Sequence, residues 1–302
     1  MSSSPPPSAD RPAPVPPRPE LPEGVWRPEP PRPPQGRDGL PRWPLWAPFA
    51  AMLATLIVAV VGVGLIALVV ELAGVDTAGD DTPPGITIGG TYVQDLALIG
   101  SALVLARLLD PPLTAGKLGL RLTQLGPAVG WTLLSWFGFF GFAWVWSVAL
   151  GITENDDLPE ELGVEGSTAA LIAVSLLVCV LAPIAEELFF RGFCFTALRR
   201  TLGMLPAAVL TGIIFGAIHL GGTEIEFIVP LMVFGFFLCL LYVWTDSLLP
   251  CIVLHALNNA LALGVSQDWG AATAIAMAAA AVLAAAIVLP FARRASTPGI
   301  AA

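Results

Sequence analysis

Charged residues are scarce in this sequence. Asp, Glu, Lys and Arg together make up 12% of its 302 residues, against the roughly 25% typical of soluble domains. This shortage excludes an ordinary soluble domain. In its place, the chain has several apolar runs that reach the ~20 residues needed to cross a bilayer as a helix. The sequence therefore predicts a polytopic membrane protein.

Cysteine is also rare, and its spacing excludes two kinds of small domain. The four cysteines lie within or beside apolar runs, and they contain no Cys-x-x-Cys pair. Neither a disulfide framework nor a zinc ribbon is expected, so we interpret them as small core residues. They are Cys179, Cys194, Cys239 and Cys251.

Aliphatic clusters are missing from residues 1–43, which are crowded with proline and carry six arginines and five acids. Such a segment has too little apolar surface to fold. We expect a disordered, partly polyproline cytoplasmic tail that serves as a spacer rather than as a docking segment. It is not a signal peptide, because the first apolar run starts only near Leu45. Residues 44–295 would form the bundle, and residues 296–302 a short C-terminal tail.

The apolar runs predict an all-α bundle of about eight transmembrane helices in the plasma (cytoplasmic) membrane. Both termini are expected in the cytoplasm, because all 14 lysines and arginines then fall on one side. The opposite loops contain none of them, and residues 152–167 carry six acids. The expected spans are about 45–70, 88–109, 126–151, 168–190, 205–220, 227–244, 248–265 and 270–291.

The stretch Leu181–Arg191 places two adjacent carboxylates and a guanidinium at the end of an apolar run. Placing an ionisable group inside a membrane-spanning helix costs free energy, so such residues are by default candidates for a functional role. At about 100° per residue, Glu187 and Arg191 lie roughly 40° apart on a helix and can pair, while Glu186 points about 100° away from Glu187. Glu186 is therefore the carboxylate without a partner on its own helix.

Only two histidines occur, and both lie in apolar spans. A lone buried histidine is more often a structural core residue. These two histidines, however, lie in the same three spans as the glutamates, the arginine and the asparagines, and this clustering favours a functional site. His255 and Asn259 lie on one helix face. If the fourth and fifth spans form a hairpin that turns near Gly203, the depths of Glu186 and His219 match within about one turn. The depth of His255 fits less well.

These residue types are typical of a hydrolase. A carboxylate and a histidine can position and deprotonate a water, and a second histidine with an asparagine can donate hydrogen bonds to an oxyanion. The same glutamate and histidines could instead bind zinc. The motifs His-Glu-x-x-His, Gly-x-Gly-Asp and Gly-x-Ser-Gly of other intramembrane proteases are missing, as is a P-loop. No nucleic acid is expected as a partner.

Three ordered motifs resemble the signature of the CPBP intramembrane proteases. This family contains CAAX prenyl protease 2 and bacteriocin-processing, immunity and lysostaphin-resistance proteins. The motifs are Ala-Pro-Ile-Ala-Glu-Glu-Leu-Phe-Phe-Arg-Gly at 182–192, Phe215-x-x-x-His219 and His255-x-x-x-Asn259. The resemblance covers about residues 168–265, and Leu118-Gly-Leu-Arg121 is similar to the family's segment before the core.

The resemblance implies an eight-helix membrane endopeptidase whose substrate is a membrane-associated, prenylated (CAAX-type) or leader peptide at the lipid bilayer. No cofactor is favoured, because a histidine that serves the oxyanion leaves zinc short of nitrogen ligands. If zinc is bound, Glu186, His219 and His255 would hold it. The implied roles are Glu186 and His219 for the attacking water, His255 and Asn259 for the oxyanion, and Glu187 and Arg191 as support.

Two other classes of function remain open. A non-catalytic membrane scaffold or bacteriocin-immunity factor would keep the same polar residues for folding and partner binding. A proton-coupled transporter would use glutamate and histidine as a relay, but the sequence lacks the paired interrupted helices of repeat-built carriers.

Overall fold

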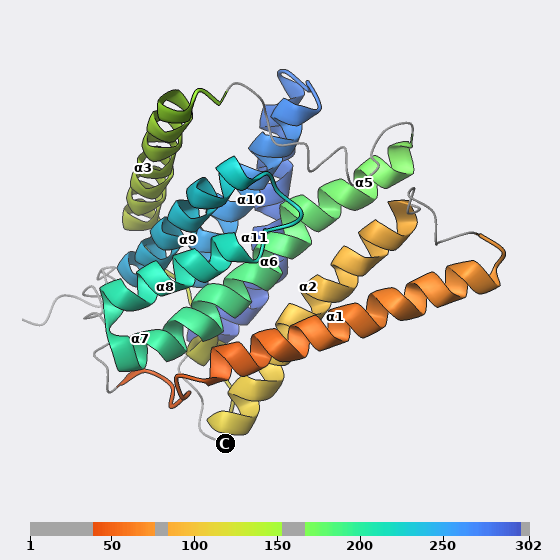
Figure 1. Cartoon of the computed structure of the whole chain (residues 1–302). Coiled ribbons are helices and arrows are strands. Elements are labelled where there is room, and N and C mark those ends of the chain that lie inside the picture. Colours follow the sequence, from red (N-terminus) through yellow and green to blue (C-terminus); the bar gives the residue numbers. More distant parts are fainter. Residues whose placement is uncertain (1–38, 76–83, 153–166, 297–302) are drawn as a thin grey trace, which may run out of the picture. The chain divides into compact units, whose positions relative to one another are not determined.

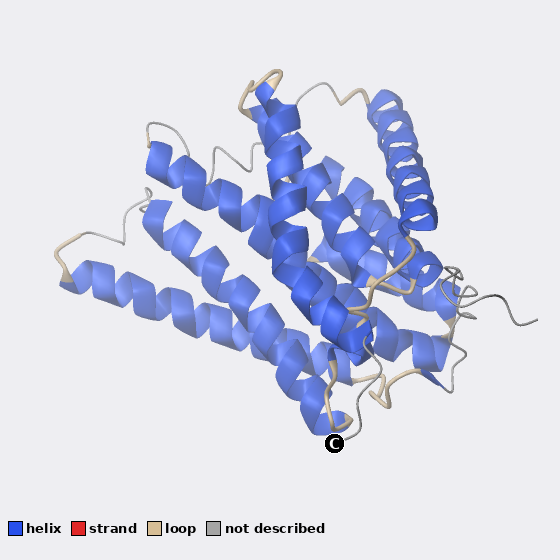
Figure 2. Cartoon of the chain, turned by 180° about the vertical axis from the view of Figure 1, so that it is seen from behind, coloured by secondary structure: helices blue, strands red, loops and turns tan. Residues whose placement is uncertain are grey.

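A computed structural model describes residues 39–75, 84–152 and 167–296, and these form helices and turns without a β-strand (Figure 2). The predicted all-α fold class is confirmed. The helices are α1 (Ala47–Leu72), α2 (Pro84–Leu109), η2 (Ala115–Leu118), α3 (Leu125–Leu150), α5 (Thr168–Leu176), η3 (Leu177–Leu181), α6 (Ala182–Glu187), η4 (Leu188–Phe195), α7 (Thr196–Leu202), α8 (Met204–Ala217), α9 (Ile225–Thr245), α10 (Leu248–Ser266) and α11 (Ala272–Ser296).

Seven helices within the described residues are long and apolar enough to cross a membrane. The longest is Thr168–Leu202, one continuous helix of 35 residues in which the π-helical stretches η3 and η4 interrupt the α-helical geometry. The predicted hairpin turn near Gly203 follows directly after it. The fifth predicted span is shorter than expected, because the 14 residues of α8 extend only about 21 Å at ~1.5 Å per residue.

The long helix runs through the middle of the bundle (Figure 1). On one side α1 lies along α2, and on the other side α3 lies along α9. The segment η4 contributes the most deeply buried aromatic side chains, whereas α1 exposes apolar side chains along most of its length, as a helix facing lipid does. The fully buried phenylalanines of η4 are Phe189, Phe190, Phe193 and Phe195.

The short helix α8 lies against α9 almost backbone to backbone. A Cβ at Gly212 would stand 2.6 Å from the Met232 carbonyl oxygen, and a Cβ at Gly216 would stand 2.8 Å from that of Ile228. This small-x-x-x-small spacing is the one that lets membrane helices approach closely. The contact buries Phe215, which lies between the two glycines, in the core of the bundle.

The bundle begins earlier than the sequence suggested. Trp43 is fully buried, its indole N–H donates to the carbonyl of Ala106 at 3.1 Å, and its ring centre lies 5.0 Å from that of Phe193. Proline and arginine at positions 41, 42 and 44 interrupt the apolar residues around Trp43, which is why the expected boundary fell at residue 44. The rest of the predicted tail, residues 1–38, lies outside the described residues.

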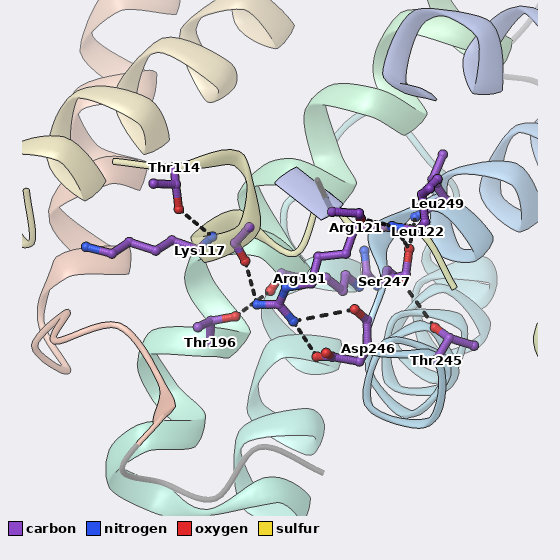
Figure 3. Close-up of polar contacts among 12 residues, drawn as sticks. Thr114, Lys117, Arg121, Leu122, Arg191, Thr196, Thr245, Asp246, Ser247 and Leu249 are labelled. Atoms are coloured by element: carbon purple, nitrogen blue, oxygen red, sulfur yellow. Dashed lines mark hydrogen bonds and ion pairs between the residues drawn. The ribbon is translucent and has the colours of Figure 1, made fainter. Parts of the chain in front are cut away.

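The turn between α9 and α10 is clamped by Arg121 (Figure 3). Its guanidinium pairs with the carboxylate of Asp246, and its carbonyl accepts a hydrogen bond from the Ser247 hydroxyl. The same hydroxyl accepts from the backbone N–H of Leu249 and so caps α10. The loop before α3 therefore fixes the point at which α10 starts.

Gly119 completes this clamp. Its φ of +76° is unfavourable for other residues, and a Cβ at this position would collide with the ring of Tyr242. Its carbonyl accepts a hydrogen bond from the N–H of Leu248 at 2.9 Å. The glycine in the Leu118–Arg121 motif is thus required by both backbone conformation and space.

Both ends of the described chain are tied to the same loop. The hydroxyl of Ser296 accepts from the N–H of Leu122, and the N–H of Arg42 donates to Asp110. Residues at both ends of the described chain therefore lie beside the segment that joins α2 and α3. Arg191 lies within the long helix and is fully buried in its pair with Glu187, as the expected pairing on one helix requires. Most of the acidic 152–167 loop lies outside the described residues.

Candidate active site

Arg191 and Glu187 form the ion pair that their spacing predicts. Both side chains are fully buried, and Nη1 of Arg191 lies 2.7 Å from Oε1 of Glu187. Nη2 donates to the Gly235 carbonyl of α9 at 2.9 Å, and the guanidinium carbon stands 4.6 Å from the centre of the Phe215 ring, a cation–π contact. The pair therefore connects the long helix to both α8 and α9.

His255 of α10 joins this pair. Its Nδ1 donates to Oε1 of Glu187 at 2.8 Å, and its Nε2 lies 3.9 Å from Oε2 of Glu186. The rings of Phe215 and Phe234 stand edge-on at 5.8 and 5.5 Å. Because a carboxylate only accepts, Nδ1 carries a proton, and Nε2 is the nitrogen directed toward Glu186. Glu186 and Glu187 thus both face the ring of His255.

The height of His255 follows from where α10 starts. A Cβ at Gly192 would lie 3.2 Å from Cδ1 of Leu248, the first residue of α10. That helix therefore begins level with Gly192 rather than with the turn at Gly203, about three turns further along. Glu187 precedes Gly192 by 5 residues, and His255 follows Leu248 by 7 residues, so the two side chains lie at similar depths in the bundle. The expectation that the depth of His255 matches that of the glutamates poorly is therefore wrong.

His219 stands apart from this group. It lies in the turn after α8 and is half-buried, and its Nδ1 donates to the carbonyl of Phe215 at 2.8 Å. Its ring centre lies 5.2 Å from that of Phe215, which stands in turn 5.8 Å from that of His255. Among the described contacts, His219 has none with Glu186. The phenylalanine of the second motif therefore lies near the rings of both histidines.

Asn259 lies one turn after His255 on α10, as its spacing predicts. Its amide donates to the carbonyl of Val178 at 2.9 Å. Val178 belongs to η3, and π-helical turns are frequent at functional sites. The asparagine thus fastens α10 to the long helix, and its second N–H is available for another acceptor.

Three polar atoms of this group have no hydrogen-bond partner among the described residues. They are Oε2 of Glu186, Oε2 of Glu187 and Nε of Arg191. Buried polar groups are nearly always satisfied, so such atoms indicate where a water or a substrate group binds. The unpartnered oxygen of Glu186 is the one that faces His255.

A fourth unpartnered atom belongs to Asp95, a residue that sequence reasoning missed. Asp95 lies in the middle of α2, is 2% exposed, and its Oδ2 has no partner among the described residues. The helix α2 packs against α6, which carries Glu186. The signal was available in the sequence, because a carboxylate within an apolar span is a functional candidate wherever it occurs.

The candidate zinc ligands do not form a metal site. Within the described chain, no three His, Cys, Asp or Glu side chains are placed to hold a metal ion. Glu186 and His255 approach each other, whereas His219 has no described contact with either of them. As these side chains are placed in the described chain, they do not bring three ligands to one ion.

Comparison with known proteins supports the resemblance. Residues 168–261 match the family described as Rce1-like, type II CAAX prenyl endopeptidase. No curated protein and no solved structure matches the chain. The matched segment contains both glutamates, Arg191, both histidines and Asn259. The resemblance based on the three motifs is confirmed.

Proposed function

We propose, from the match of residues 168–261 to the family described as Rce1-like, type II CAAX prenyl endopeptidase, that the chain hydrolyses peptide bonds by a water activated by Glu186. The observation that carries the proposal is the convergence of Glu186, Glu187, Arg191 and His255 from two helices within an apolar core. The substrates would be prenylated CAAX-type, leader or other membrane-associated peptides.

Glu186 would be the general base. Its unpartnered oxygen lies 3.9 Å from Nε2 of His255, which permits one water to stand at about 2.8 Å from both atoms. As the water attacks the carbonyl carbon of the substrate, its proton passes to Glu186, which then gives it to the leaving nitrogen. His255 would hold the water, because Glu187 and Arg191 fix its ring orientation.

The developing oxyanion would be stabilised by donors around the water. The second amide N–H of Asn259 is one candidate. His219, which lies next to Phe215 in the turn after α8, is another. A metal is not needed for any of these steps, and we favour a metal-free glutamate mechanism.

Both termini would face the cytoplasm. The proposal is supported by the basic residues and by the hydrogen bond that holds Ser296 at the loop carrying Lys117 and Arg121. Cysteines introduced at Asp156 and Ser296 should be labelled from opposite sides of the membrane. Labelling of both from the same side would contradict this topology.

The activity is tested with the full-length chain in liposomes. A farnesylated CAAX-type peptide, the same peptide without the prenyl group and a membrane-anchored leader peptide are supplied separately, and mass spectrometry identifies any cleaved bond. Asn259→Ala should lower the rate on the order of 10²–10³-fold, while its neighbour Asn258→Ala serves as the matched control. Intact peptides in every arm would instead favour a non-catalytic scaffold.

A further inference from the structure

An open pocket of about 440 Å³ lies between the segment before α1 and the loop that joins α2 to α3. Its volume falls within the roughly 300–1,000 Å³ that is usual for small-ligand sites. The nine residues that line it include three cations, Arg42, Lys117 and Arg121, and one acid, Asp110. None of the residues of the candidate active site lines this pocket. It therefore offers an excess of positive charge at a place that peptide hydrolysis does not use.

The wall of the pocket formed by residues 39–42 is held in place by the rest of the bundle. Nη1 of Arg200, at the end of α7, donates to the carbonyls of Leu40 and Pro41 at 3.0 and 3.3 Å. The fully buried Trp43 follows directly in the chain. Because these contacts fix the backbone, a ligand does not have to order this segment in order to bind.

The acid in the pocket is already compensated. Oδ2 of Asp110 lies 3.0 Å from Nζ of Lys117 and accepts the backbone N–H of Arg42 at 3.2 Å. Arg121 is likewise paired, with Asp246. The side chain of Arg42 is exposed, and its guanidinium forms no ion pair among the described residues. Arg42 is thus the cation whose charge remains for a ligand.

The opposite wall adds two hydrogen-bond donors. The ammonium group of Lys117 contacts the carbonyl and the carboxylate of Asp110 at 2.7 and 3.0 Å, which leaves one of its three N–H groups. The hydroxyl of Thr114 accepts the backbone N–H of Lys117 (Figure 3), and its own hydrogen can still be donated. A guanidinium, an ammonium N–H and a hydroxyl together suit the several oxygens of a phosphate group.

The pocket lies at the level where the membrane-spanning helices end. The helix α2 ends at Leu109, one residue before Asp110. The last turn of α11 lies beside η2, since a Cβ at Gly116 would stand 4.0 Å from that of Ala295. Trp46, just before α1, is 55% exposed, as is common for tryptophan at a membrane–water interface. At this level a bilayer presents the phosphates of its lipid headgroups, and basic pockets between spanning helices can bind them.

We propose that this pocket binds the headgroup phosphate of an anionic phospholipid. The guanidinium of Arg42 pairs with the phosphate, and Lys117 and Thr114 donate to its other oxygens. The bound lipid joins the segment before α1 to the loop after α2, and it stabilises the folded bundle because the unfolded chain lacks the pocket. Such a lipid touches none of the residues assigned to peptide hydrolysis, so its binding is independent of the proposed function.

Thermal melts of the full-length protein in detergent micelles test the ligand. Dioleoylphosphatidylglycerol, dioleoylphosphatidylcholine and inorganic phosphate are titrated separately. Phosphatidylglycerol should raise the melting temperature of the wild type in a saturable way, and more than phosphatidylcholine, which has the same acyl chains but no net charge. Inorganic phosphate at the same concentrations should leave it unchanged. Equal rises with the two lipids would overturn the proposal, and a rise with inorganic phosphate as large as that with phosphatidylglycerol would exclude a lipid as the occupant.

Three variants test the pocket. Arg42→Gln should weaken the apparent affinity for phosphatidylglycerol about fivefold, while the backbone N–H that Asp110 accepts is kept. Arg42→Lys, which keeps the charge, should retain most of the affinity. The matched control is Arg107→Gln, which removes an exposed cation from the last turn of α2 that does not line the pocket; its affinity should equal that of the wild type.

Equal losses in Arg42→Gln and Arg107→Gln would indicate diffuse attraction to a basic surface and would contradict a defined site. An unchanged affinity in Arg42→Gln would contradict it as well. The titrations of the wild type decide between the two lipids and inorganic phosphate even if Arg42→Gln does not fold.

Discussion

Replacing Arg191 with methionine leaves a shorter, unbranched apolar side chain and removes the guanidinium that pairs with Glu187. Both side chains are fully buried, so Glu187 would be left charged without compensation. Breaking a buried pair in this way typically costs about 3–5 kcal/mol. The carbonyl of Gly235 also loses its donor, and the cation–π contact with Phe215 disappears.

A double-mutant cycle isolates the pair from these other losses. Glu187→Gln keeps an oxygen that can still accept from Nδ1 of His255, and the double variant Glu187→Gln/Arg191→Met contains no buried charge at either position. We expect the double variant to be less destabilised than the sum of the single variants, with a coupling of up to about 3 kcal/mol. Unfolding in mixed detergent micelles measures each free energy.

The control is Arg294→Met, an equivalent change at an exposed position at the end of α11. It should alter the free energy of unfolding by no more than about 0.5 kcal/mol. If Arg191→Met is as stable as Arg294→Met, the guanidinium does not compensate Glu187, and the account of the buried pair is refuted.

Three further predictions concern the clamp, acid stability and metal. Gly119→Ala should destabilise the protein by about 1–3 kcal/mol in thermal melts, because it meets the Tyr242 ring, whereas Gly64→Ala, with open space around its Cβ, should not. Burial acts to raise the pKa of Asp110, but the hydrogen bond and charge of Lys117 and the N–H of Arg42 lower it below its usual value. The stability from this contact is therefore present above about pH 4 and is lost as the pH falls further; melting temperatures should drop more on acidification in the wild type than in Lys117→Met. Cleavage should persist in a strong chelator, and elemental analysis showing about one zinc per chain, lost together with activity, would contradict the metal-free mechanism.

Local geometry along one helix was predictable from the sequence. The pairing of Glu187 with Arg191 was expected from their i, i+4 spacing on one helix, and the ion pair is observed. The number of apolar helices follows likewise from the length of the apolar runs. The π-helical stretches η3 and η4 were not predicted, because their sequences contain no residue type that distinguishes them from an α-helix.

Distances between helices were less predictable. The depth comparison assumed that the α9–α10 turn lies level with Gly203, and it therefore favoured His219 over His255 as the neighbour of Glu186. In the structure the clamp at Gly119 and the lack of a side chain at Gly192 set α10 about three turns away from that level. Such a register depends on contacts between segments far apart in the chain, and spacing within a segment does not reveal it.

Asp95 was missed for a different reason. It belongs to none of the three motifs, and its helix lies outside the segment that contains them. Its burial and its unpartnered oxygen emerge only when α2 packs against α6.

Cleavage by Glu186→Gln, measured beside its melting temperature, tests the central claim most directly. The substitution keeps the volume of the side chain but cannot accept a proton from water. We expect a protein that accumulates and melts like the wild type, while peptide cleavage falls by at least the ~10²–10⁴-fold of a lost general base. Cleavage at the wild-type rate by folded Glu186→Gln would show that Glu186 is not the base and would contradict the proposed mechanism.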